Sequence, residues 1–290
     1  MRLRLLPLDI PALLALLPSK EKALVEACKK GDLAGIEKAL LRGASANITT
    51  TGGFTPLMLA AMNGHTEAVR LLIRSGASPN FRQKDGSSPI HDAIFGGDLE
   101  MMKLLLKAGA DPSLVDGGGY APIILAAARP ETDCLEVLLD REVDVDAKTQ
   151  HGRTAVFEAC YWGRLANLRL LLEAGANPNV RHTEDGLYPL LVFVGHVRAW
   201  NEDKELRRPE GYLETLELLL KKGADVGVLD RDRENVLGAA VRVGHDFEVV
   251  RRLFEAGADP QNCDKDGDSA LTHAARHPDP RVSALMTSPR

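Results

Sequence analysis

The chain has 290 residues, of which 44% are hydrophobic and 27% are charged, a composition typical of globular proteins. Its net charge of −5 supplies no basic face for a nucleic acid, so we expect no nucleic-acid partner. No apolar stretch reaches the roughly 18–20 residues that a membrane span requires, so we expect no membrane partner.

The first element is an apolar segment, residues 1–19, which we expect to be a cap on the fold or a docking segment. Arg2 and Arg4 precede an apolar stretch, as in a secretion signal. However, Pro7, Asp9 and Pro11 interrupt that stretch, and no small-x-small cleavage site follows. We therefore do not expect secretion.

A repeat then fills most of the chain, and the dipeptide Thr55-Pro56 marks its phase. Equivalent positions recur every 33 or 34 residues, with one interval of 47. They are Ala23, Pro56, Pro89, Pro122, Ala155, Pro189, Val236 and Ala270. A period of this length indicates a solenoid built from stacked repeats.

Each repeat reads as turn, helix, loop, helix and turn. Thr55 suits a helix N-cap and Pro56 the first helical position, where the missing N–H costs nothing. Asn63-Gly64 ends the first helix, and Gly76 supplies the left-handed residue that ends the second. Asp85-Gly86 is then a tight turn before the next repeat.

The pattern "TPLMLAA", Gly, "EAVRLLI", "GASPN" resembles the ankyrin repeat, whose consensus is T-P-L-H-x-A-A, Gly, a leucine-rich helix and G-A-D-x-N. The resemblance covers residues 20–286, as seven units and a C-terminal half unit. It implies an all-α solenoid of helix-turn-helix units joined by β-turn or hairpin loops. The units at 22–47 and 266–286 are expected to be caps, and 287–290 a tail.

Two repeats depart from this pattern. Glu142 replaces the helix-ending glycine, which is expected to cost about 1 kcal/mol if the left-handed backbone is kept. The sixth repeat has Phe193 and Val194 where other repeats have small residues, which predicts a wider helix spacing there. The same repeat carries a charged insertion at 198–211, which is either a solvated loop or packed through Trp200 and Tyr212.

The segment from Leu6 to Cys28 has a second resemblance, to the first half of an F-box: Leu-Pro, an acidic residue and Ile, a second Leu-Pro, then a helix ending in Cys. An F-box would imply docking to a cullin-type ubiquitin ligase. The repeat pattern already begins at Gly31, however, where an F-box would continue. The alternatives are a working F-box, a degenerate one and a plain capping helix.

We find no catalytic motif, and we expect no enzyme, cofactor or metal site. The run Gly117-Gly118-Gly119 falls at a turn between repeats and is not expected to bind phosphate. His273 and His277 are four residues apart, a spacing that suits two metal ligands on one helix, but no third ligand is near. Cys28, Cys134 and Cys160 lie in apolar helical patterns and are expected in the core. Cys263 does not lie in such a pattern.

A stack of two-helix repeats forms a groove suited to binding. The ankyrin resemblance implies recognition through the turn tips and the exposed side of the first helices. The scarce aromatic residues, 4% of the chain, gather there. The expected partner-binding residues are Phe54, Met62, Phe95, Tyr120, Arg129, Tyr161 and Trp162. Tyr161 and Trp162 have an alternative role, which is to fill gaps beside small neighbours.

The predicted function is a non-catalytic scaffold or adaptor for an unknown protein partner, expected as a monomer in the reducing cytoplasm or nucleus. The alternative is the substrate-recognition subunit of a ubiquitin ligase. Lys29, Lys30, Arg242 and Arg276, at the two ends of the first-helix face, predict a partner with acidic flanks.

Overall fold

The computed structural model describes residues 18–195 and 211–288. The chain divides into two compact units, unit 1 (residues 1–122) and unit 2 (residues 123–290). The described residues are helical apart from turns and two isolated β-bridges, Leu229–Asn235 and Cys263–Ser269. The expected all-α repeat architecture is therefore confirmed.

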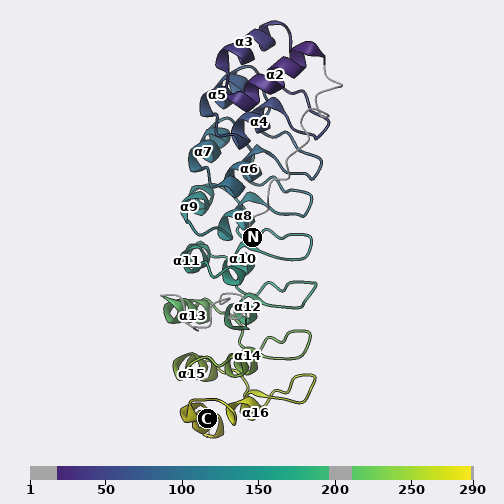
Figure 1. The fold of residues 1–290 in the computed structure, drawn as a ribbon. Helices are drawn as coiled ribbons and strands as arrows, with labels where there is room; N and C mark the ends of the chain where they lie inside the picture. Colours follow the sequence, from purple (N-terminus) through teal and green to yellow (C-terminus); the bar gives the residue numbers. More distant parts are fainter. Residues whose placement is uncertain (1–17, 196–210, 289–290) are drawn as a thin grey trace. The chain divides into compact units, whose positions relative to one another are not determined.

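Unit 1 contains three helix pairs. They are α2 (Ser19–Lys30) with α3 (Leu33–Leu41), α4 (Pro56–Met62) with α5 (Thr66–Arg74), and α6 (Pro89–Gly96) with α7 (Leu99–Lys107). The first helices α2, α4 and α6 contact one another in sequence, and each also contacts its own second helix. Figure 1 shows the first helices between the second helices and the turn loops.

Unit 2 continues the same pairing. Its pairs are α8 (Pro122–Ala127) with α9 (Asp133–Leu139), α10 (Ala155–Tyr161) with α11 (Leu165–Glu173), α12 (Pro189–Gly195) with α13 (Tyr212–Lys221), α14 (Val236–Val243) with α15 (Phe247–Glu255), and α16 (Ala270–Ala274) with α17 (Pro280–Thr287). Pro122, the first residue of α8, is the last residue of unit 1. From α10 onward, first helices contact first helices and second helices contact second helices (Figure 1).

The marker residues set where the first helices begin. From Pro56 to Ala270, every marker is the first residue of its helix. Thr55 caps α4, because its Oγ1 accepts the backbone N–H of Met58 at 3.3 Å, and Thr154 caps α10 in the same way. The first repeat is different: α2 begins at Ser19, four residues before Ala23, and its N-cap Pro18 makes no side-chain bond.

Most second helices end at a glycine with a left-handed backbone. Gly76 has φ 85°, and the N–H of Ala77 reaches back to the carbonyl of Leu72 at 2.9 Å. The left-handed backbone on which the expected cost at Glu142 depends is not kept, because Glu142 does not take a positive φ. Instead α9 stops at Leu139, and the N–H of Val143 bonds to the carbonyl of Arg141 at 2.8 Å. The chain leaves the helix by another turn and avoids the unfavourable backbone.

Asparagine side chains join successive repeats at these helix ends. Asn47 donates from Nδ2 to the carbonyl of Gly76 and accepts from the N–H of Ser78. Asn80 makes the same pair of bonds with Gly109 and Asp111 one repeat later. In unit 2, Asn179 makes it with Gly223 and Asp225. One side chain thus satisfies two backbone groups of the following repeat.

A basic side chain joins the loops between paired helices in a similar way. His65 Nε2 lies 2.9 Å from the carbonyl of Lys29, at the end of α2. Arg164 Nε donates to the carbonyl of Ala128 at 3.0 Å, and His245 Nε2 lies 2.9 Å from the carbonyl of Val194. Each bond satisfies a carbonyl at or just after the end of the previous first helix, which would otherwise lack a partner.

The fourth repeat has a modified loop, and a buried asparagine compensates for it. Its loop contains Pro130 in place of the usual glycine. Asn167, which is fully buried in α11, donates from Nδ2 to the carbonyls of Ala127 and Arg129 at 3.2 and 2.8 Å. A polar residue at this core position is therefore explained by the carbonyl groups that it satisfies.

The turns between repeats approach one another closely in unit 1. The N–H of Gly117 donates to the carbonyl of Asp85 at 2.7 Å, and Gly86 has φ 81°. A Cβ atom on Gly86 would lie 2.5 Å from the nitrogen of Gly117. The glycine run at 117–119 therefore lies at a turn, as expected.

The core contains a row of leucines and the three thiols expected there. Leu72, Leu105, Leu138 and Leu171 occupy one position in four successive second helices, and all are fully buried. Cys28, Cys134 and Cys160 are buried and Cys263 is exposed. Burial raises the pKa of Cys28 to about 12 and that of Cys134 to about 11, so these thiols are unreactive core residues.

The sixth repeat contains an aromatic stack. Phe193 is fully buried in α12, and its ring centroid lies 4.5 Å from that of Tyr212, the first residue of α13. Tyr212 is 2% exposed and also stacks on His245 of the next repeat. Of the two aromatic residues expected to pack, Tyr212 does so against the repeats. Trp200 and insertion residues 198–210 lie outside the described residues, and the wider helix spacing stays a prediction.

We expect Leu171→Ala to lower the free energy of unfolding by about 2–5 kcal/mol, because it leaves a cavity between second helices. Denaturant unfolding of the purified chain measures this loss. Glu173→Ala, on the exposed side of the same helix, is the control and should change stability by less than about 0.5 kcal/mol. A loss below about 1 kcal/mol for Leu171→Ala would contradict the packing described here.

Candidate functional site

Two positions on each first helix face the same side, three and six residues after the marker. We call them row 3 and row 6. In unit 1, row 3 is Glu26, Leu59 and Asp92, and row 6 is Lys29, Met62 and Phe95. Because the first helices contact one another in order, these six residues form one patch.

The apolar part of this patch is accessible. Phe95 is 67% exposed and Met62 is 39% exposed, although both are large and apolar. Leu59, at row 3, is buried. Exposed apolar side chains gathered on one face are typical of binding surfaces. The unit 1 patch therefore has two of the expected contact residues, Met62 and Phe95, in the expected orientation.

Asp92 lies among these apolar residues, one helical turn before Phe95. Its Oδ2 accepts a hydrogen bond from Nε2 of Gln83 at 2.9 Å. Burial raises the pKa of the Asp92 carboxyl to about 7, and the charge of Asp85 adds to this increase. Near neutral pH the patch is therefore poised between a charged and an uncharged state.

The aromatic residues at the turn tips of unit 1 are less exposed than expected. Phe54 and Tyr120 are both half-buried. The carbonyl of Tyr120 lies 3.1 Å from Nε2 of His91, which is buried in α6, and the N–H of Tyr120 donates to Asp116. Tyr120 therefore has a structural role in the turn in addition to any contact with a partner.

In unit 2 the equivalent acid is Glu158, at row 3 of α10, and it has charged and polar partners. Its Oε1 lies 3.1 Å from Nη1 of Arg153, and its Oε2 accepts the indole N–H of Trp162 at 2.9 Å. Only 5% of its side chain is exposed. The acid and the indole therefore hold each other in place.

Aromatic rings surround this ion pair. The guanidinium of Arg153 lies 5.2 Å from the ring centroids of both Phe157 and Tyr161. The rings of Tyr161 and Trp162 meet edge to face at 5.2 Å. Trp162 remains 43% exposed and Tyr161 is half-buried. Unit 2 thus presents a tryptophan whose orientation is fixed before any partner arrives.

Arg129, the remaining expected contact residue, belongs to the loop after α8. Its Nη2 lies 3.0 Å from Oε2 of Glu131, and 21% of its side chain is exposed. Its carbonyl accepts the bond from Asn167 described above. The side chain and the carbonyl of Arg129 therefore both have partners that stabilise the modified loop.

The residues that sequence reasoning missed are the polar partners of the aromatic ones. Asp92 and Glu158 stand at row 3 and are visible in the repeat alignment as acids at a position otherwise mostly apolar. Arg153 and Gln83 come from turn tips, so only the fold shows that they reach these acids.

The expectation of free basic groups at the ends of the first-helix face needs correction. Lys29 Nζ lies 3.1 Å from Glu26, and Arg242 forms a two-bond ion pair with Glu234 at 2.6 and 2.8 Å. Lys30 and Arg276 are exposed. Because half of these charges are neutralised by the protein's own carboxylates, they give little support to a partner with acidic flanks.

The two C-terminal histidines do not share a helix. α16 ends at Ala274, so it contains His273 but not His277. His277 Nε2 lies 2.9 Å from the carbonyl of His245 and joins the last two repeats. Within the described residues, no three histidine, cysteine, aspartate or glutamate side chains are arranged so that they could hold a metal ion.

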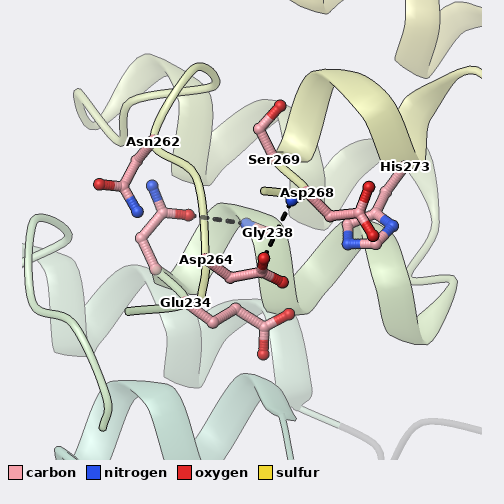
Figure 2. A pocket seen from close by; sticks show the side chains of 8 residues that line it. Glu234, Gly238, Asn262, Asp264, Asp268, Ser269 and His273 are labelled. Atoms are coloured by element: carbon pink, nitrogen blue, oxygen red, sulfur yellow. Dashed lines mark hydrogen bonds between the residues drawn. The ribbon is translucent and has the colours of Figure 1, made fainter. Parts of the chain in front are cut away.

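Acidic residues also gather at the last turn of unit 2, around Glu234, Asp264, Asp268 and His273 (Figure 2). Asp264 accepts the N–H of Asp268 at 2.9 Å, and Asn235 accepts that of Gly238 at 2.8 Å, as the dashed lines in Figure 2 show. Glu234 is paired with Arg242. These side chains already build the turn and cap α14, so they do not form a free binding site.

No helix within the described ranges combines the length and the hydropathy required to cross a bilayer.

A family model described as "Ankyrin repeats (3 copies)" matches residues 24–116, 97–182 and 208–286. Among curated proteins, mouse "Ankyrin repeat and SOCS box protein 16" is 30% identical over 164 residues, which cover 47% of this chain and 36% of that protein. Human "Ankyrin repeat and SOCS box protein 6" is 29% identical over 154 residues, covering 50% and 36%.

A third similar protein is "Putative ankyrin repeat protein L86" of Acanthamoeba polyphaga mimivirus, which is 25% identical over 140 residues. That alignment covers 44% of this chain and 24% of the viral protein. The chain thus aligns with about a third or less of the length of these relatives.

We expect Asp92→Asn to make the protein more stable at pH 8 but not at pH 4. The pKa of Asp92 is raised in the folded chain, so the unfolded chain releases the carboxyl proton at a lower pH than the folded chain does. The free energy of unfolding of the wild type therefore falls as pH rises from about 4 to about 7. The asparagine variant has no carboxyl group at this position and does not lose stability in this way. Its free energy of unfolding at pH 8 should exceed that of the wild type by about 1–3 kcal/mol.

Denaturant unfolding at several pH values measures this effect. Glu100→Gln, an exposed acid of α7, is the matched control and should show no such trend. Parallel pH profiles for wild type and Asp92→Asn would show that the burial of Asp92 has no energetic consequence.

Proposed function

The chain belongs to the ankyrin repeat family, and on that basis we propose that it is a non-catalytic adaptor that binds a protein partner. The row 3 and row 6 side of the first helices is the proposed contact surface. The observation that carries the proposal is the exposure of Phe95 at row 6, at 67%, and of Trp162, the residue after row 6 of α10, at 43%. Aromatic anchors of this kind supply much of the binding energy at protein interfaces.

The two patches differ in how they are built, and both suit recognition. In unit 1, Met62 and Phe95 offer apolar contact around one acid. In unit 2, Glu158 and Tyr161 hold Trp162 in one orientation, so little conformational freedom is lost on binding. Phe54, Tyr120 and Arg129 are proposed as supporting contacts at the turns and loops. We further propose a monomer that acts in the cytoplasm or nucleus.

A second candidate is the substrate-recognition subunit of a ubiquitin ligase. It is favoured by the names of two relatives, which combine ankyrin repeats with a SOCS box. The F-box-like segment at Leu6–Cys28 falls partly outside the described residues. Its last part lies in α2, where Leu24, Val25 and Cys28 are buried in the first repeat. These side chains serve the stack, which argues for a cap there rather than for a complete F-box.

Deleting residues 1–17 separates the two candidates, because α2 begins at Ser19 and remains intact. Loss of a ubiquitin-ligase component from purified complexes, with the other partners retained, would support the second candidate. Unchanged complexes would support the simple adaptor.

We expect Trp162→Ala to reduce partner affinity by about 2 kcal/mol. Its effect on the free energy of unfolding should stay well below the ~3–5 kcal/mol of a buried aromatic residue, because Trp162 is 43% exposed. Affinity purification with the full chain and denaturant unfolding measure the two quantities.

Phe95→Ala should behave in the same way, whereas Glu173→Ala on α11 should leave both measurements unchanged. A large loss of stability with full recovery of partners would show that Trp162 fills a gap and is not an anchor.

A further inference from the structure

We propose that the unit 1 patch of Met62, Asp92 and Phe95 recognises an arginine side chain of a partner polypeptide, with an apolar residue of the same segment against Met62. The inference rests on the proposed function and specifies the chemistry of the partner. It assigns Asp92 as the residue that determines specificity.

The first argument is that Asp92 lacks the cation that its counterpart has. Glu158 occupies the same row 3 position in unit 2 and is paired with Arg153 and the indole of Trp162. Within the described residues, no lysine, arginine or histidine forms an ion pair with Asp92, and its hydrogen-bond partner is the neutral amide of Gln83. A half-buried carboxylate without a cation is unfavourable, and a partner's cation would relieve this cost.

The charges around Asp92 reinforce this argument. Asp85, on the adjacent turn, acts on Asp92 with the same sign. Of the cations on the adjacent turn, Arg82 is bonded to the carbonyl of Val115 and Lys84 to that of Thr51. His91, beside Asp92 in sequence, is turned toward Ser88 and Tyr120. These basic residues are therefore engaged elsewhere, and a positively charged partner group is complementary to the acids at this site.

The geometry favours arginine over lysine. Gln83 occupies Oδ2 of Asp92, so Oδ1 is the oxygen left for a donor from the partner. Phe95 follows one helical turn later and is 67% exposed. A planar guanidinium can donate to the carboxylate while its face stacks on an aromatic ring, whereas an ammonium group offers no such face. Met62, in the same row as Phe95, is 39% exposed and can contact an apolar side chain of the partner.

The test uses the full chain and a phage-displayed library of random 12-residue peptides, selected at pH 8. Selected peptides are synthesised, and their affinities are measured for wild type, Phe95→Ala, Trp162→Ala, Asp92→Asn and Glu100→Gln. Peptides that bind at least tenfold more weakly to Phe95→Ala define the ligands of this patch. Glu100→Gln removes one exposed carboxylate on α7 and serves as the matched charge control.

We expect the Phe95-dependent peptides to contain an arginine next to an apolar residue. Replacing that arginine by citrulline, which keeps the shape and removes the charge, should weaken binding to wild type at least tenfold. The same replacement should change binding to Asp92→Asn less than twofold, and lysine should be a poorer substitute than arginine. Binding to wild type should also weaken about tenfold from pH 8 to pH 6, as a carboxyl with a pKa of about 7 takes up its proton, but not in Asp92→Asn.

Phe95-dependent peptides without a basic residue would overturn the inference, as would a citrulline effect of equal size on wild type and Asp92→Asn. The proposed function is judged separately by peptides that depend on Trp162. If these exist and Phe95-dependent ones do not, the arginine site is wrong and the adaptor function stands. If neither kind is found, both are overturned.

Discussion

The repeats depend on one constraint, which is that the backbone groups at each helix end need hydrogen-bond partners from the neighbouring repeat. A helix leaves its last carbonyls and first N–H groups without partners, and in a stack many of these ends are shielded from water. Here Asn47, Asn80 and Asn179 bond forward to the next repeat. His65, Arg164 and His245 bond backward to the previous one. The stacking of apolar helices therefore comes with a polar requirement at every repeat.

The fold was largely predictable because this constraint leaves a mark on the sequence. The markers from Pro56 to Ala270 each begin a helix, since a proline or small residue after a capping residue is a local signal. Glu142 is instructive. The sequence shows a missing glycine, but only the backbone shows that α9 ends at Leu139 and that Glu142 does not adopt the left-handed conformation. The burial of Asn167 was equally unpredictable, because the carbonyl groups that it satisfies belong to a loop far away in the sequence.

The candidate surface was predictable in its apolar part only. Counting along the repeat places Met62, Phe95 and Trp162 on the accessible side of the helices, and the structure finds all three exposed. Their polar companions come from turns up to nine residues away, as with Gln83 and Asp92. Neutralisation of Arg242 by Glu234, eight residues earlier, was hidden for the same reason. Helical periodicity carries no information about which turn residue folds back onto a helix.

The side chains that join the repeats and those that face a partner are different residues of each unit. The glycine, asparagine and capping positions hold one repeat to the next, whereas row 3 and row 6 make few of these bonds. Selection can therefore change the outward rows while the joining residues stay fixed, and a duplicated repeat can acquire a new ligand without first losing its ability to fold. Glu158 and Asp92 illustrate such divergence. At this shared position Glu158 is paired with a cation of its own repeat, whereas the carboxylate of Asp92 is bonded to the neutral amide of Gln83.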